Sequence, residues 1–106
     1  MARLKSADLR ALAARDAIVI VPVASTEQHG PHLPTSVDTV LVGEVARRAA
    51  RKIAARLPVV VAPTLWCGLA EHHLAFGGTF SFTFPTYLAV LRDLVSSLKR
   101  QGFRRI

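Results

Sequence analysis

Four side chains that can bind a metal ion or move a proton lie within one short stretch of the sequence, at Glu27, His29, His32 and Asp38. Glu27 and His29 are two positions apart, so an extended backbone places both side chains on the same face. The residues between His29 and Asp38 include one glycine and two prolines, which favour turns and can bring Asp38 back to that face. Two carboxylates and an imidazole in this arrangement predict half of a metal site.

The elements on either side of this stretch indicate how it is positioned. Ala17 to Val23 is an apolar, largely β-branched run, which is typical of a strand covered on both faces. Val37 to Leu57 has apolar residues at helical spacing, with Ser36 as a candidate N-cap and Pro58 as a stop. Ligands of α/β proteins bind outside the carboxyl ends of parallel strands, and the stretch lies at such an end.

The rest of the chain continues the alternation of helix and strand. Ser6 is a candidate N-cap for a helix over 7–15, and 59–62 has the composition of a second buried strand. A polar loop is expected over 64–79, followed by alternating phenylalanines over 80–84 that fit a half-buried strand or an extended arm. The pattern therefore predicts an α/β fold.

The last third of the sequence predicts a helix and the approach to another strand. Thr86 is a candidate N-cap for a helix with one apolar stripe, and Gly102 suits the position after the helix end. Residues 103–106 resemble the start of a further parallel strand. We therefore expect residues 1–106 to be the N-terminal part of a single larger domain, truncated after the third helix.

Composition and charge restrict the class of protein. Of the 106 residues, 51% are hydrophobic, which argues against disorder. No apolar run approaches the roughly 18 residues that cross a bilayer, and no membrane partner is expected. A single cysteine, Cys67, cannot form an internal disulfide, so we expect a cytoplasmic protein.

The net charge of +7 raises the alternative of a nucleic-acid-binding module. The basic residues are spread over three predicted helices and the C-terminal segment, and only one dense group, over 47–56, is present. No aromatic residues alternate with that group to stack on bases. Nucleic acid is therefore the less favoured partner, and steep salt dependence of binding would reveal it.

Two sequence blocks resemble the creatininase (creatinine amidohydrolase) family. Residues 21–34 read Val-Pro-Val-Ala-Ser-Thr-Glu-Gln-His-Gly-Pro-His-Leu-Pro and are followed by Asp38, as in the family signature. Residues 68–79 are similar to the second block, although Ala70, His72 and Gly77 stand where the family often has serine, glutamate and proline. The likeness continues to residues 102–106 and covers nearly the whole chain.

The resemblance implies a three-layer α/β/α fold and a dinuclear-metal amidohydrolase, usually a homohexamer, that acts on a small-molecule amide. Carried over to this sequence, Glu27 would bind one metal ion, His29 the other, and Asp38 would bridge them. His32 would orient a ligand, and Glu71, His73 and Thr79 would line or support the substrate pocket. Two carboxylates and an imidazole suit Zn²⁺ or Mn²⁺ and also accept Fe²⁺.

The family's remaining metal ligands belong to a motif on the strand that follows the third helix, where this sequence ends. We therefore expect a metal-dependent amidohydrolase of a non-peptide C–N bond, cyclic or linear, that is inactive as the isolated 106-residue chain. The alternative is a non-catalytic remnant or interaction domain, whose exposed sheet edge would associate with a partner.

Overall fold

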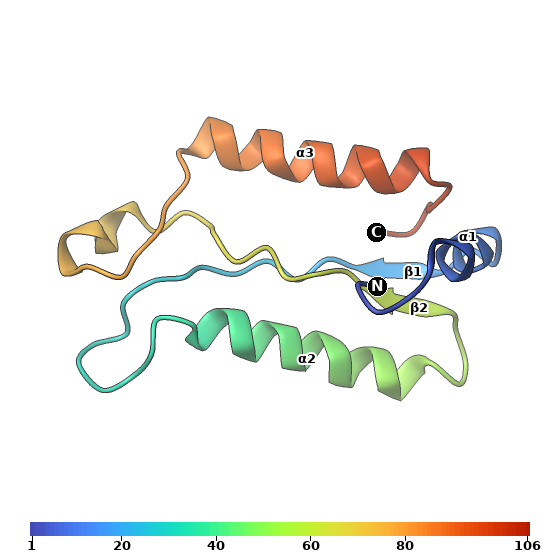
Figure 1. Cartoon of the computed structure of the whole chain (residues 1–106), viewed down its shortest axis with the longest axis horizontal. Helices are drawn as coiled ribbons and strands as arrows, with labels where there is room; N and C mark the ends of the chain where they lie inside the picture. The colour runs from blue at the N-terminus through green and yellow to red at the C-terminus, as the bar shows by residue number, and fades with distance from the viewer.

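The computed structural model describes all residues from Met1 to Ile106 and confirms an α/β chain. Its elements follow in the order α1 (Ser6–Ala14), β1 (Ile18–Ile20), α2 (Val37–Ile53), β2 (Val59–Val61), the 3-10 helix η1 (Glu71–Phe76) and α3 (Phe84–Arg100). The helices α2 and α3 lie on opposite faces of the small parallel sheet, which makes three layers (Figure 1).

The strand β1 lies at the centre of the sheet. It pairs in parallel with β2, with Ile18 opposite Val59 and Ile20 opposite Val61. On its other side the Val19 amide donates to the carbonyl of Arg105 at 2.8 Å. The chain thus runs from β1 through α2 to β2, which is the neighbour of β1 on one side. It then runs through α3 to the C-terminal segment, which is the neighbour of β1 on the other side. Such a reversal leaves a crevice at the carboxyl end of the central strand, and residues 21–38 leave β1 at that end.

Beyond the two short strands the segments that follow them stay side by side. The predicted strand over 17–23 is regular only to Ile20, because Pro22 has no N–H group to donate to the ladder. Pairing resumes at Val23 and Leu65, one residue out of the register of β1 and β2. The Ala24 amide then donates to the Leu65 carbonyl at 2.8 Å, which extends the paired region towards the site.

A glycine permits the closest approach between these segments. A Cβ atom at Gly68 would lie 2.9 Å from the carbonyl oxygen of Ala24 and 2.7 Å from the hydroxyl of Ser25. On its other side Gly68 pairs with Ser81, and the Phe80 amide donates to the Thr26 carbonyl at 3.0 Å. The segment that carries Glu27 is therefore in contact with two other extended segments, which contain Gly68 and Phe80.

Three of the predicted helix boundaries are wrong. The first helix begins at Ser6 itself, and the preceding Lys5 amide donates to the Asp8 carboxylate at 2.9 Å, so Ser6 is not the N-cap. The N-cap of α3 is Thr83 and not Thr86, because Pro85 fits within the first turn, where no N–H donor is needed. The helix α2 ends at Ile53, before the predicted residue 57.

Other boundary predictions are confirmed. Ser36 occupies the N-cap position of α2, although its side chain makes no capping hydrogen bond. Gly102 follows the end of α3 with a φ of +92°, a conformation that favours glycine. The bridge between Ile18 and Arg105 shows that the C-terminal segment joins the sheet as a parallel neighbour of β1.

The chain exposes more surface than a compact protein of its size. Only 12 of 106 residues are buried, with a core around Val19, Val60, Leu98 and Phe103. The accessible area is 7272 Å², against about 5,800 Å² for a typical monomer of this mass. The radius of gyration is 15.6 Å, where about 13 Å is usual. No helix combines the length and apolar character that crossing a membrane requires.

Candidate metal site at the carboxyl end of β1

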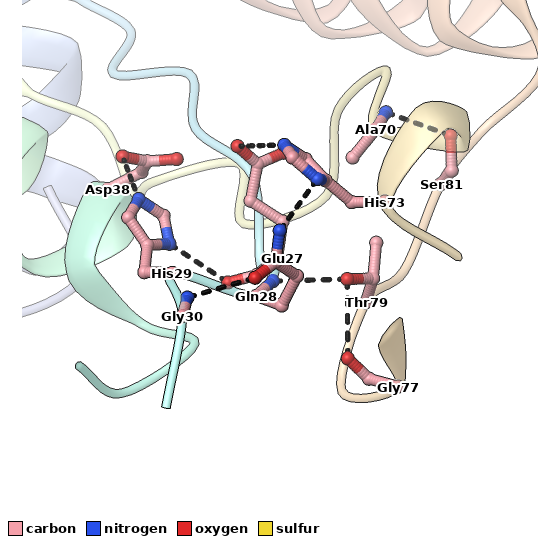
Figure 2. A network of polar contacts seen from close by, with 10 residues as sticks. All are labelled: Glu27, Gln28, His29, Gly30, Asp38, Ala70, His73, Gly77, Thr79 and Ser81. Atoms are coloured by element: carbon pink, nitrogen blue, oxygen red, sulfur yellow. Dashed lines mark hydrogen bonds and ion pairs between the residues drawn. The ribbon is translucent and has the colours of Figure 1, made fainter. Parts of the chain in front are cut away.

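Glu27, His29 and Asp38 come together beyond the carboxyl end of β1. Each offers one donor atom, and the three donor atoms lie within 4.8 Å of one another. Glu27 and His29 belong to the extended segment after β1, and Asp38 lies in the first turn of α2 (Figure 2). No other three carboxylate, imidazole or thiol side chains of residues 1–106 meet in this way.

The orientation of the His29 ring follows from its hydrogen bond to the main chain. Its Nδ1 atom lies 3.0 Å from the carbonyl oxygen of Glu27, and a carbonyl oxygen only accepts, so Nδ1 carries the proton. The Nε2 atom of the neutral ring then has a free lone pair, and it lies 3.5 Å from Oδ1 of Asp38. Histidines that bind metals are commonly oriented by such a second hydrogen bond.

The donor set fits a divalent cation. In the neutral ring the Nε2 lone pair faces a carboxylate oxygen, and the Glu27 carboxylate adds a second negative charge close by. A proton on Nε2 or a metal ion between these atoms removes their repulsion. The side chains of Glu27, His29 and Asp38 are 18%, 24% and 38% exposed, so solvent reaches all three of them.

Two hydrogen bonds to main-chain carbonyls hold the loop that brings Asp38 to the site. The Glu27 amide donates to the Thr35 carbonyl at 3.1 Å, which ties the two ends of the loop together. The Thr39 hydroxyl donates to the Ser25 carbonyl at 3.3 Å and so fixes the first turn of α2 against the segment after β1. Asp38 is therefore brought back to the face of Glu27 and His29, as the turn residues predict.

Of the four residues expected to support the site, His73 lies next to a donor residue and Thr79 contacts the neighbouring Gln28. His73, on η1, has its Nε2 atom 4.0 Å from Oε1 of Glu27. The Thr79 hydroxyl accepts a hydrogen bond from the Gln28 amide at 3.1 Å. His32 and Glu71 are exposed and make no hydrogen bond to the three donor residues.

The sequence analysis assigned no role to Gln28, although three of its polar atoms form hydrogen bonds in this region. Its main-chain amide donates to Thr79, its side-chain nitrogen lies 2.8 Å from Nδ1 of His73, and its side-chain oxygen accepts from the Gly30 amide at 2.9 Å. The signal was a polar residue between Glu27 and His29. In an extended segment successive side chains point to opposite faces, so the pattern separates Gln28 from Glu27 and His29 but does not identify its hydrogen-bond partners.

The thiol of Cys67 lies outside the candidate site. The residue is buried, and burial raises the pKa of the thiol, which disfavours the thiolate that would bind a metal or act as a nucleophile. Cys67 is therefore a small buried residue of the fold.

Part of the dense basic group of α2 is neutralised within the helix. Arg48 and Arg47 both donate to the Glu44 carboxylate, at distances of 2.8 and 2.9 Å, and these hydrogen bonds lower the pKa of Glu44. Such exposed pairs contribute little to stability.

The sequence of the chain is similar to those of known proteins. The sequence profile of the creatininase family, described as creatinine amidohydrolase, matches residues 2–106. The chain is 34% identical to a 3-dehydro-scyllo-inosose hydrolase of Thermotoga maritima over 97% of its own length and 29% of that protein's. It is 33% identical to a creatinine amidohydrolase of Pseudomonas putida, over 90% of this chain and 37% of the relative.

The solved structures agree in fold. A structure described as an E122Q mutant creatininase of Zn-Zn type superimposes with a TM-score of 0.88 and 30% identity, over 99% of this chain and 42% of the other. The chain thus spans 29% and 37% of the lengths of the two curated relatives and less than half of the solved structure.

Proposed function

The chain belongs to the creatininase family, and from this premise we propose that residues 27–38 provide part of the metal site of a hydrolase. The single observation that carries the proposal is the convergence of Glu27, His29 and Asp38 within 4.8 Å. We propose that residues 1–106 form the N-terminal part of a single creatininase-like domain. The short coverage of its relatives supports this.

The donor set indicates which metal ions are suitable. One imidazole nitrogen and two carboxylates accept Zn²⁺, Mn²⁺ or Fe²⁺, and the description of one solved relative as a Zn-Zn type favours zinc. Catalytic zinc sites typically use three protein ligands for each ion. Because three donors are too few for two ions, we propose that the remaining ligands come from protein outside residues 1–106.

The residues of this chain have separate tasks in the proposed reaction. Glu27 and Asp38 supply negative charge, and His29 supplies a neutral donor whose free nitrogen is fixed by its bond to the Glu27 carbonyl. A divalent metal ion held there would polarise a carbonyl group and provide a nucleophile from water at neutral pH. Because the three side chains are partly exposed, a substrate could reach the metal ion.

We propose hydrolysis of a non-peptide amide C–N bond, cyclic or linear, in a small molecule. The creatinine amidohydrolase among the relatives supports this reaction, whereas the inosose hydrolase shows that family membership alone does not select a substrate. Because three donors are too few for two ions, residues 1–106 by themselves are expected to bind metal without turning over an amide. Its assembly as a homohexamer and its cytoplasmic location remain predictions.

Calorimetric titration with zinc chloride tests the metal site. We expect the chain to bind zinc, and Asp38→Asn to weaken binding more than about 100-fold, since loss of an outer-shell partner alone costs about 10–100-fold. The matched control is Asp93→Asn, which removes an exposed carboxylate of α3 far along the chain and should bind zinc like the parent. Equal affinities of the two variants would contradict the proposal.

A further inference from the structure

A chain of hydrogen bonds that begins at the main-chain amide of Gly30 determines which ring nitrogen of His73 carries the proton. The Gly30 amide donates to the Gln28 side chain at 2.9 Å, and an N–H group needs an acceptor, so the atom facing Gly30 is the amide oxygen (Figure 2). The Gln28 atom that lies 2.8 Å from Nδ1 of His73 must therefore be the nitrogen of the NH₂ group.

The protonation of the His73 ring follows in the same way. An NH₂ group only donates, so Nδ1 of His73 has to offer a lone pair. The neutral ring then carries its proton on Nε2, and that nitrogen lies 4.0 Å from Oε1 of Glu27. His73 thus directs an N–H group, rather than a lone pair, towards the carboxylate.

The two histidines beside Glu27 are therefore in opposite tautomers. His29 has its proton on Nδ1, bonded to the Glu27 carbonyl, and directs a lone pair towards Asp38. His73 has its proton on Nε2 and cannot offer that nitrogen as a ligand while the tautomer holds. Only one of the two imidazoles is prepared to bind a cation.

We infer that His73 is a positioning residue for the Glu27 carboxylate, and that Gln28 sets its tautomer. At 4.0 Å the N–H group attracts Oε1 electrostatically without a direct hydrogen bond, and this attraction favours the carboxylate orientation that has Oε1 towards His73. The inference rests on the proposed function in taking Glu27 as a ligand. Partial burial supports the role, since the side chains of His73 and Glu27 are 27% and 18% exposed.

The tautomer can be measured without any metal. Long-range ¹H–¹⁵N correlation spectra of the metal-free chain, at a pH where His73 is neutral, distinguish a protonated from an unprotonated ring nitrogen. His73→Gln and His29→Gln provide the assignments. We expect His73 with its proton on Nε2 and His29 with its proton on Nδ1. A His73 ring protonated on Nδ1 would overturn the inference, whatever the chain does with zinc.

Gln28→Leu tests the origin of the tautomer. The variant removes the NH₂ donor, so the His73 signals should move to those of a mixture of tautomers, while the His29 signals keep their pattern. Gln101→Leu removes the other glutamine of the chain, at the end of α3, and should leave both rings unchanged. An unchanged His73 spectrum in Gln28→Leu would show that Gln28 does not set the proton.

Zinc titration tests the positioning itself. His73→Leu should weaken binding about 10-fold or more, as loss of an outer-shell partner does, whereas His73→Gln retains an N–H group at a similar distance and should restore most of the affinity. Equal affinity of His73→Leu and the parent would overturn the positioning role. If the parent binds no zinc, the proposed function fails, and the spectra still decide the tautomer.

Discussion

At the scale of single residues, the site depends on what each polar atom is able to donate or accept. Glu27 and His29 share a face because they are two apart in an extended segment, and this was predictable from the sequence. The return of Asp38 was also predictable, from the glycine and prolines that precede it.

The tautomers were not predictable from the sequence. They depend on which atoms face the Glu27 carbonyl and the Gln28 amide, and both contacts arise from the fold. His73 comes from η1, more than forty residues after Glu27 in the chain, so no local pattern connects them. His32, close to the site in sequence, is exposed, because nearness in sequence does not fix the direction of a side chain in a loop.

At the scale of elements, prolines explain where the predicted boundaries move. Pro22 interrupts the strand after Ile20, since a missing N–H group breaks the ladder even within an apolar run. Pro85 has the opposite consequence, because the first turn of a helix tolerates it and α3 starts earlier than expected. Apolar periodicity located α1, α2, α3 and both strands, but the 3-10 helix η1 lies in the segment predicted as a polar loop. The caps depended on hydrogen bonds that periodicity does not contain.

Two threonines provide a test of the start of α3. The Thr83 side chain accepts from the Thr86 amide, so Thr83→Ala should lower the free energy of unfolding by about 1 kcal/mol. Thr86→Ala keeps that acceptor and should change it by less than about 0.5 kcal/mol. Urea unfolding followed by circular dichroism measures both. A larger loss in Thr86→Ala would contradict the assigned cap.

At the scale of the whole molecule, the chain leaves much of its apolar surface open. Several large side chains of α2 and α3 are more than half exposed, including Val40 at 60%, Val45 at 64% and Phe84 at 65%. The sequence predicted the topology up to the segment that pairs with β1. It did not indicate how loosely α3 would pack, with Leu98 as its one buried residue.

This open surface predicts concentration-dependent self-association of the 106-residue chain. Its net charge of +7 opposes association at low ionic strength, so added salt should strengthen it by screening the repulsion. Sedimentation velocity over a series of protein and salt concentrations gives the species present. A monomer at all concentrations, or an association that salt weakens, would show that apolar contacts are not responsible.

The most direct measurement of the central claim is X-ray absorption at the zinc edge on the chain loaded with less than one equivalent of zinc. With His29, Glu27 and Asp38 as ligands, the spectrum should show one imidazole, oxygen neighbours and no sulfur, although the sequence has four histidines and a cysteine. The imidazole signal should disappear in His29→Gln and persist in His73→Gln. Sulfur ligation, or an imidazole signal that survives His29→Gln, would contradict the proposed site.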